Sequence, residues 1–383
     1  MIIGIDARAL QEPVRTGVPT YLEQILKRII PKAPKHEFRL FVNAHDPSKG
    51  AWRKSLDFPN VKIIETRWPH KLLHASMLVF HWPKLEKYLG QVDVLFIPTI
   101  FFTSFRKNTK IVQTFHDLSF ERYGQELSFF GNLWHRVLRP KKVAMRADHI
   151  LSVSESTKQE LKNLYNINPA KITVTHLDGH SDVSTIQAKK SRELAWLEDE
   201  TPFFLSVGTQ EPRKNIPALI EAFDLYKQQT DSKAQLIIAG GSGYSPDEYI
   251  DEVVAKSPYR KEIYQLGYVS DEEKKWLYEN ATGLVFTSLY EGFGLPLLEA
   301  FSADIPVLTS SVSSLPEVAQ EAALVVDPWR VDQIAEGLEG LANMAGKLRE
   351  RGQQQRQLFS WDKAADQTLE VLINLGENGA HRN

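Results

Sequence analysis

The residues best suited to chemistry lie in the segment 291–299, whose sequence is Glu-Gly-Phe-Gly-Leu-Pro-Leu-Leu-Glu. The carboxylates of Glu291 and Glu299 are good bidentate acceptors for the vicinal hydroxyls of a sugar. The two glycines open the backbone to a ligand, and Pro296 favours the start of a helix. We therefore expect Glu291 in a loop and Glu299 in a first helical turn. The alternative is a surface Glu291 and a Glu299 that caps its helix.

A second candidate site is the pair Arg213 and Lys214, which stands between the apolar run 203–207 and a predicted helix. Asn215 is a plausible N-cap of that helix. The planar fork of Arg grips a diphosphate, and Lys adds a point charge. Two cations at a helix N-terminus are unfavourable unless an anion joins them, so the pattern favours a bound phosphate over a solvated pair.

Two further loops each follow a predicted strand. Gly17 precedes a helix start marked by Pro19, where free N–H groups suit a phosphate; an ordinary turn and cap is the alternative. His116 ends a strand and can donate to a hydroxyl or a phosphate. A structural pair with Asp117 is an equally good interpretation.

Two glycine-containing turns complete the candidate loops. Tyr268 and Val269 follow Gly267, where backbone groups suit a nucleotide base. The turn 240–243, Gly-Gly-Ser-Gly, lacks the G-x-G-x-x-G fingerprint of dinucleotide sites and is interpreted as a plain loop.

Short apolar runs alternate with segments of helical period in two successive blocks. Runs that are almost continuously apolar are typical of parallel strands covered on both faces. The pattern predicts two doubly wound, Rossmann-like α/β domains facing a central cleft, with ligands at the carboxyl ends of the strands. The predicted strands are 2–5, 38–42, 61–64, 92–97, 110–114, 149–153, 172–175, 203–207, 235–239, 263–266, 283–286, 305–308 and 323–326. The main predicted helices are 20–30, 154–164, 216–227, 271–280, 296–302, 331–344 and 359–375, with a frayed tail from Gly376.

Composition and charge limit the classes of function. No cysteine is present, which excludes disulfides and cysteine-ligated metals. The N-terminus has the pattern of a strand rather than of a signal peptide, and no run approaches the roughly 18 apolar residues of a spanning helix. Residues 1–180 contain 27 Lys and Arg against 16 Asp and Glu, a balance of +11, and the remainder has a balance of −13. We expect a cytoplasmic protein whose basic half favours an anionic surface or a phosphate-linked ligand, and no nucleic acid.

Together these motifs resemble those of family-4 glycosyltransferases of the two-Rossmann-domain (GT-B) architecture, especially bacterial mannosyltransferase-like members. The resemblance extends over the whole chain, and the Glu-x7-Glu block with its inner Gly-Phe-Gly-Leu-Pro is highly specific. It implies an acceptor-binding domain over 1–180, a nucleotide-sugar-binding domain over 181–358, and a helix over 359–383 that packs back on the first domain. The segments that carry it are 4–8 with 16–17, 115–117, 153–158, 208–215, 291–299, 309–318 and 322–328.

The resemblance also implies roles for matching positions. Arg213 and Lys214 would hold the donor diphosphate, helped by the backbone at Gly17. Glu291 would bind the donor sugar and Glu299 the ribose. The further donor-binding positions are Gly208, Tyr268, Val269, Phe293, Gly294 and Leu295.

The family retains anomeric configuration, usually without a metal or another cofactor, by same-face substitution. His116 would lie over the sugar near its anomeric carbon, and the leaving phosphate would take the acceptor's proton. Two positions depart from the family's pattern. Gly17 stands alone where a Gly-Gly pair is common, and Asp178-Gly179 stands where Asn-Gly is common.

The acceptor side is marked only by segments that mix aromatic and basic residues, 67–84, 101–110 and 129–146. In the third segment Trp134 and Leu138 stand among Arg136, Arg139 and Lys142. Such segments lie on an anionic membrane surface, or they form helices that bury Trp and expose Lys and Arg. We expect peripheral association with the inner face of the membrane and a saccharide or polyprenyl-linked acceptor.

The leading hypothesis is a retaining hexosyltransferase of cell-surface polysaccharide synthesis, with GDP-mannose as the first candidate donor. The run Ser-Ser-Leu-Pro-Glu over 313–317 and the mannosyltransferase-like N-terminus favour that donor. A related GT-B phosphorylase or sugar-nucleotide epimerase is a second possibility. A catalytically idle nucleotide-sugar-binding protein is a third.

Overall fold

The structure is a computed structural model that describes residues 1–11, 17–44, 50, 52–123, 137–179, 187–191, 194–195, 197, 201–241 and 248–380. The chain forms two compact units. Unit 1 comprises Met1–Leu118, Leu133–Leu177 and Ser360–Asn383, and unit 2 comprises Ser119–Asn132 and Asp178–Phe359. Some positions on which the sequence made predictions lie outside the described residues: Thr16, residues 129–136 with Trp134 and Arg136, the domain boundary at 180–181, Ser242, Gly243 and residues 381–383.

Unit 1 is built on a seven-stranded parallel sheet in the order β3-β2-β1-β4-β5-β6-β7. The strand order reverses between β1 and β4, as in a doubly wound sheet. The strands are β1 (Ile2–Asp6), β2 (Glu37–Asn43), β3 (Val61–Thr66), β4 (Val94–Ile97), β5 (Lys110–Phe115), β6 (His149–Ser152) and β7 (Ile172–Val174).

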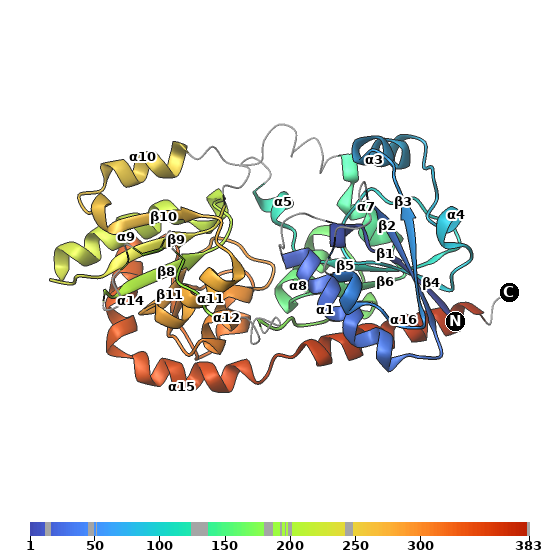
Figure 1. The fold of residues 1–383 in the computed structure, drawn as a ribbon. Helices are drawn as coiled ribbons and strands as arrows, with labels where there is room; N and C mark the ends of the chain where they lie inside the picture. Colours follow the sequence, from blue (N-terminus) through green and yellow to red (C-terminus); the bar gives the residue numbers. More distant parts are fainter. Residues whose placement is uncertain are drawn as a thin grey trace. The chain divides into compact units, whose positions relative to one another are not determined.

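Helices pack on this sheet, among them the last helix of the chain. Figure 1 shows α16 in red beside α1, and α16 also contacts β4, β5 and β6. Trp361 at the start of α16 is 2% exposed and lies near Tyr21, with 6.4 Å between the ring centroids. The helices of unit 1 are α1 (Gly17–Lys32), α2 (Trp52–Ser55), α3 (His70–Val79), α4 (Glu86–Leu89), α7 (Pro140–Arg146), α8 (Glu155–Tyr165) and α16 (Trp361–Ala380).

Unit 2 is built on a six-stranded parallel sheet in the order β10-β9-β8-β11-β12-β13, which reverses between β8 and β11. Its strands are β8 (Phe203–Val207), β9 (Gln235–Ala239), β10 (Ile263–Gly267), β11 (Gly283–Phe286), β12 (Val307–Ser310) and β13 (Leu324–Val326). Its helices are α5 (Ser119–Arg122), α9 (Ile216–Gln229), α10 (Glu248–Lys256), α11 (Asp271–Asn280), α12 (Leu295–Ser302), α13 (Leu315–Ala319), α14 (Val331–Asn343) and α15 (Ala345–Arg356).

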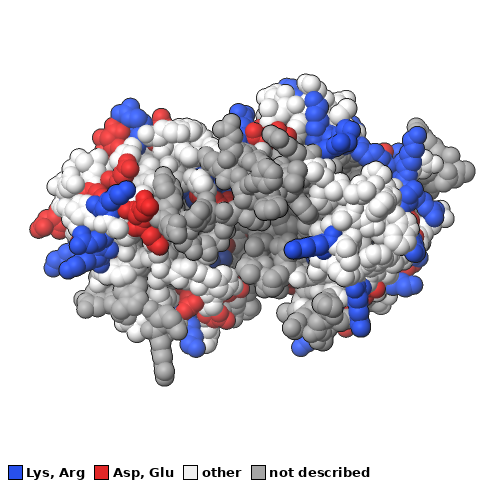
Figure 2. Space-filling view, turned by 90° about the horizontal axis from the view of Figure 1, so that it is seen from above, with Lys and Arg blue, Asp and Glu red and all other residues white. Residues whose placement is uncertain are grey.

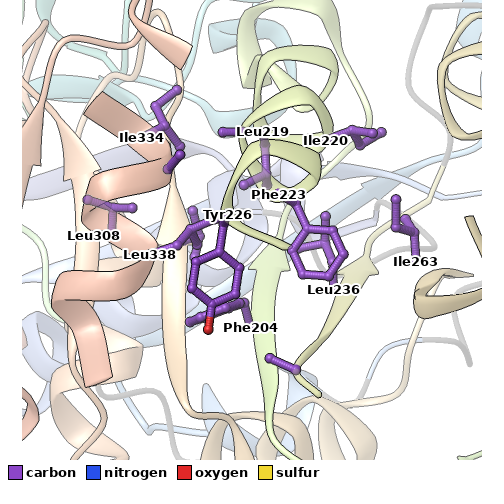
Figure 3. Packing of buried hydrophobic residues seen from close by; sticks show 14 of the residues in the cluster. Phe204, Leu219, Ile220, Phe223, Tyr226, Leu236, Ile263, Leu308, Ile334 and Leu338 are labelled. Carbon is purple, nitrogen blue, oxygen red and sulfur yellow. The ribbon is translucent and has the colours of Figure 1, made fainter. Parts of the chain in front are cut away.

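The core of unit 2 forms where α9 and α14 cover the sheet (Figure 3). Leu219, Phe223 and Tyr226 recur at helical spacing on α9 and face the strands. Phe223 is fully buried, and Tyr226 packs edge-to-face on Phe204 of β8, with ring centroids 5.5 Å apart. This packing fixes the start of α9, and with it the Arg213–Lys214 loop, on the end of β8.

Each of the thirteen predicted strands is present, and the seven main predicted helices correspond to α1, α8, α9, α11, α12, α14 and α16. The expected frayed tail from Gly376 is wrong, because α16 continues to Ala380 and a Cβ at Gly376 would lie 2.2 Å from Met1 Cε. The first helix begins at Gly17 rather than at Pro19. The main predicted helices do not include α10 or α15. The helices α3 and α7 lie in the segments 67–84 and 129–146, for which helices were one of the two interpretations.

Candidate active site

Two loops of unit 2 flank the point where its strand order reverses. One follows β8 and carries Arg213 and Lys214; the other follows β11 and carries Glu291. Open α/β sheets bind ligands at this point, outside the carboxyl ends of the strands. The topology therefore brings the two sequence motifs together.

The three side chains form one ion-paired cluster. Lys214 Nζ lies 2.5 Å from Glu291 Oε1, and Arg213 Nη1 lies 3.1 Å from Glu291 Oε2. Arg213 also donates from Nη1 to the Tyr290 carbonyl at 3.1 Å and from Nε to Glu211 Oε2 at 2.7 Å. Glu291 therefore joins the two loops through both of its oxygens, each of which has a further lone pair for a ligand hydroxyl.

Burial and charge act in opposite directions on this cluster. Burial lowers the pKa of Lys214, although the neighbouring Glu291 carboxylate raises it. Burial also raises the pKa of Glu291, but Lys214 and Arg213 outweigh that effect and hold this pKa below its usual 4.5. Glu291 is therefore ionised at neutral pH.

The charge balance of this loop differs from the expectation based on the sequence. The cations beside the helix start were expected to require a bound anion, but Glu211 and Glu291 supply two carboxylates from the protein itself. The cluster of Arg213, Lys214, Glu211 and Glu291 is therefore formally neutral. An unpaired charge therefore does not mark this loop as a phosphate site.

Gly208 and Asn215 determine the shape of the first loop. Gly208 has φ 144°, and a Cβ there would lie 3.3 Å from Lys214 Nζ. The Lys214 ammonium lies 4.8 Å from the Phe286 ring centroid, within cation–π distance. Asn215 occupies the N-cap position of α9 in a left-handed conformation, but its side chain makes no cap. It donates instead to the carbonyls of Thr287 and Pro328 at 3.2 and 2.7 Å, so the predicted cap is wrong.

Two serines that sequence reasoning did not single out hold the Glu291 loop. Ser313 Oγ accepts the Glu291 N–H at 3.0 Å. Ser314 is fully buried, and its hydroxyl lies 3.0 Å from the Glu291 carbonyl and 2.8 Å from the Phe293 carbonyl. The run over 313–317 was noticed as a family motif, but its hydrogen bonds to a loop 22 residues earlier depend on tertiary structure.

The second carboxylate of the motif lies apart from the first. Glu299 is on α12 and pairs with Lys274 of α11 at 2.9 Å. The Glu299 carboxylate raises the pKa of Lys274. Gly294 is the N-cap residue of α12 with φ 117°, and Leu295 begins the helix. The helix starts inside the motif as expected, but it starts at Leu295 rather than Pro296, so the expected place of Glu299 in the first turn is wrong. Lys274 is a neighbour that the sequence did not predict.

The other expected donor positions of unit 2 are accessible to different extents. The Phe293 side chain is 4% exposed and packs on Phe359, with 5.8 Å between the ring centroids. Phe293 therefore offers a ligand only its backbone. Tyr268 is 67% exposed and Val269 is half-buried. Both follow β10, the edge strand of the sheet.

His116 and Gly17 belong to unit 1. His116 Nε2 donates to the Pro98 carbonyl at 2.8 Å, and the ring packs edge-to-face on Tyr21 at 4.9 Å. Burial lowers the His116 pKa below 6.5 despite the bond to Pro98. The ring is therefore neutral at pH 7, with Nδ1 as the acceptor. Gly17 is the first residue of α1.

Unit 1 contains a buried ion pair between Arg8 and Asp6. Both residues lie in the family motif 4–8, but the sequence did not predict that they contact each other. Arg8 makes two bonds to Asp6, from Nη2 to Oδ2 at 2.6 Å and from Nε to Oδ1 at 2.8 Å. Thr103 also bonds Asp6 Oδ2 at 3.0 Å, which ties the loop after β1 to the loop after β4. Nearby, burial and the Arg8 charge lower the pKa of His74 to about 4.

Membrane-spanning helices and clusters of metal ligands are both absent from the described part of the chain. No helix there is both long and apolar enough to cross a bilayer. No group of three or more His, Asp and Glu residues there is arranged as metal ligands.

Comparisons with known proteins agree with this geometry. A family model described as Glycosyltransferase Family 4 matches residues 15–177, and one described as Glycosyl transferases group 1 matches residues 188–358. The chain is 30% identical to O-antigen chain mannosyltransferase B of Escherichia coli, over 94% of this chain and 97% of that protein. This chain belongs to the family-4 glycosyltransferases. The family predicted from its motifs is confirmed.

Other relatives of this glycosyltransferase match over part of its length. O-antigen chain mannosyltransferase RfbU of Salmonella typhimurium is 31% identical over 52% of each chain. MMP alpha-(1->4)-mannosyltransferase of Mycolicibacterium hassiacum is 26% identical over 60% of this chain and 55% of that protein.

Solved structures confirm the GT-B fold of this glycosyltransferase. Sucrose-phosphate synthase from Thermosynechococcus elongatus has a TM-score of 0.72 at 18% identity, with 98% of each chain covered. WaaG, a glycosyltransferase involved in lipopolysaccharide biosynthesis, has a TM-score of 0.68 at 16% identity, over 97% of this chain and 99% of that one.

Proposed function

We propose that this glycosyltransferase transfers a hexose, with retention of configuration, from a nucleoside-diphosphate sugar that is held by unit 2. The observation that carries the proposal is the Arg213–Lys214–Glu291 cluster at the reversal of the strand order. Nucleoside-diphosphate sugars offer a diphosphate for the cations and sugar hydroxyls for the carboxylate.

The neutral cluster suggests how the donor is bound. A diphosphate that meets Arg213 and Lys214 competes with Glu291 for both cations. The Glu291 carboxylate is then released to accept hydrogen bonds from the sugar hydroxyls. Gly208 leaves room beside Lys214 Nζ for that exchange, and the N–H groups at the start of α12 give further donors.

In the proposed reaction an acceptor hydroxyl oxygen bonds to the anomeric carbon as the bond from that carbon to the diphosphate oxygen breaks. The acceptor's proton goes to the leaving phosphate oxygen. Arg213 and Lys214 stabilise the negative charge that develops there, and preorganised donors of this kind contribute about 10²–10³ in rate. We also propose that neutral His116 hydrogen-bonds the donor sugar.

GDP-mannose is the proposed donor, since the relative that matches nearly the whole chain is a mannosyltransferase by name. The proposed acceptor is a saccharide, free or linked to a polyprenyl carrier, in cell-surface polysaccharide synthesis. Glu299 and Lys274 are proposed to lie at the ribose, and the backbone at Tyr268 and Val269 at the base.

We propose that unit 1 also touches an anionic membrane from the cytoplasmic side. Large apolar side chains are exposed at α3 and just after it, namely Leu72 (60%), Val79 (63%), Phe80 (76%) and Trp82 (45%). The cations Arg67, Lys71, Lys84 and Lys87 occur in the same stretch. Figure 2 shows Lys and Arg of unit 1 standing among uncharged side chains on one face. Apolar anchors with basic neighbours suit an anionic interface.

Donor and reaction are tested in two steps. A thermal-shift screen of GDP-, UDP- and ADP-sugars is expected to select GDP-mannose. Nucleotide release is then followed with and without a saccharide acceptor, and a transferase requires the acceptor. Conversion of the donor alone would indicate an epimerase, and binding without turnover would indicate an idle binder. The anomeric configuration of the product, read by NMR, decides between retention and inversion.

The membrane proposal is tested by co-sedimentation with phosphatidylcholine vesicles that contain or lack phosphatidylglycerol. We expect binding only to the anionic vesicles and loss of that binding at high salt. Equal partitioning into both kinds of vesicle would refute the proposal.

A further inference from the structure

A groove of about 370 Å³ lies in unit 1, away from the motifs described above. It is lined by β4 and β5, by the connection between them and by α7. Two aromatic rings of that connection, Phe101 and Phe105, and the aliphatic side chains of Ile111 and Val143 give it an apolar lining.

The charged lining of the groove is entirely basic. Lys84, Lys107, Lys142 and Arg146 line it, and no Asp or Glu is among the described residues that do so. The three lysines are exposed, and within the described ranges no carboxylate pairs with them. An anion that enters the groove therefore meets lysines that are held by no carboxylate of the described residues.

Arg146 differs from the lysines because it is fixed by the protein. Its Nη2 donates to the carbonyls of Lys107 and Thr109 at 2.7 and 3.0 Å, and Nη1 lies 3.4 Å from Asp148. Its guanidinium also lies 5.1 Å from the Phe105 ring centroid. Arg146 thus joins the connection to α7 and shapes the groove between the lysines.

One edge of the groove is formed by the segment that follows α3. His81 and Lys84 line the groove, and they flank Trp82, which is 45% exposed. Ser104 of the connection donates to the His81 carbonyl at 2.6 Å, which holds the two segments together.

We propose that this groove binds the phosphate end of a long-chain alcohol phosphate. The lysines bind the phosphate oxygens, and the first carbons of the chain lie on Phe101 and Phe105. Neither an inorganic phosphate nor an uncharged alcohol uses both kinds of lining. That such a lipid carries the acceptor sugar rests on the proposed transferase function, whereas its binding here can be measured by itself.

The experiment is a calorimetric titration of the full chain with geranyl phosphate, inorganic phosphate and geraniol. We expect geranyl phosphate to bind at least about tenfold more tightly than either of the others. In the Lys107→Gln/Lys142→Gln variant its affinity should fall by about tenfold or more, since each lysine contributes charge-assisted bonds. The control is Lys54→Gln/Lys162→Gln, which removes two exposed lysines of unit 1 outside the groove and should bind as wild type does.

Equal affinity of wild type and the groove variant for geranyl phosphate would overturn the proposal. Equal affinity for geranyl and inorganic phosphate would also overturn it, because the ligand would then be free phosphate. GDP is titrated into the same proteins. If the groove variant loses geranyl phosphate binding but still binds GDP, the substitutions have affected only the groove. The absence of any GDP binding, with lipid-phosphate binding intact, argues against the donor site and leaves the groove standing.

Discussion

At the scale of single residues, the central feature is a carboxylate that holds two cations. Lys214→Ala and Glu291→Ala are each expected to lower kcat/KM by about 10²–10³ or more. Lys214→Ala removes a hydrogen-bond donor to the leaving diphosphate, and Glu291→Ala removes the acceptor for the sugar hydroxyls. Steady-state kcat/KM measures the effect, and circular dichroism checks that each variant is folded. Lys256→Ala, at a side chain 79% exposed in unit 2, is the matched control. Wild-type kcat/KM in both site variants would refute the assignment.

The depressed pKa of Glu291 predicts a specific acid sensitivity. Since the folded state holds this pKa below 4.5, the unfolded chain takes up the proton first as pH falls. The stabilisation is therefore fully present above about pH 4.5 and is lost progressively as pH drops through the folded pKa. Between pH 5 and pH 3, urea unfolding of wild type should lose stability more steeply than that of Glu291→Gln. Parallel pH profiles would contradict the ionised pair.

The sequence gives the residue types of this site but not their partners. Arg213, Lys214 and Glu291 were recognisable because each follows an apolar run at a strand end. The bonds from Ser313 and Ser314 to the Glu291 loop were not, since a serine carries no signal of what it will meet. Asn215 was assigned a cap from its position, and the left-handed backbone there turned its side chain to other carbonyls.

At the scale of elements, the loops after β8 and β9 approach so closely that a side chain does not fit. Gly240 has φ 151°, and a Cβ there would lie 1.9 Å from the Gly208 carbonyl oxygen. Gly240→Ala should lower the free energy of unfolding by about 3 kcal/mol, the range of a strained backbone position. Gly346→Ala on α15, where a Cβ meets nothing within 4 Å among the described residues, should raise it by up to about 1 kcal/mol. Thermal unfolding measures the stability of both variants. Equal effects of Gly240→Ala and Gly346→Ala would contradict the close approach of the loops after β8 and β9.

Helices and strands were predictable from the sequence where the pattern of buried residues along them is regular. Strands buried on both faces, such as β4 and β11, appear as continuous apolar runs. The helix α15 was missed because its sequence is almost entirely polar and it buries little beyond Leu348 and Gly352. The sequence left α3 undecided between a helix and a membrane-surface segment, because several of its apolar residues face solvent, which blurs its helical period.

At the scale of the whole molecule, the end of the chain belongs to the same unit as its beginning. Trp361 is 2% exposed on α16, so Trp361→Ala should lower the stability of unit 1 by about 3–5 kcal/mol. Asp362 and Asp366 form exposed ion pairs with Lys32 at 3.2 and 2.6 Å. The control Asp362→Asn/Asp366→Asn should therefore change stability by less than about 1 kcal/mol. Urea unfolding measures both, and a small effect of Trp361→Ala would show that α16 is dispensable.

The two-block pattern predicted the fold class because each block alternates strands with helices. Short, right-handed crossovers limit the strand orders that such a pattern can adopt, but they do not select one of them. The hydrogen bond of Thr103 to Asp6 and the basic groove beside α7 were not predictable, since both depend on which loops the sheet brings side by side.

The difference between the affinities for a nucleoside diphosphate and a nucleoside monophosphate tests most directly whether Arg213 and Lys214 bind the donor. GDP and GMP are titrated into wild type, Arg213→Ala/Lys214→Ala and the control Lys256→Ala. The account predicts that wild type and the control bind GDP at least about tenfold more tightly than GMP, since the two cations meet the second phosphate. It also predicts that the double variant binds the two nucleotides almost equally. A double variant that keeps the full preference for GDP would contradict the central claim.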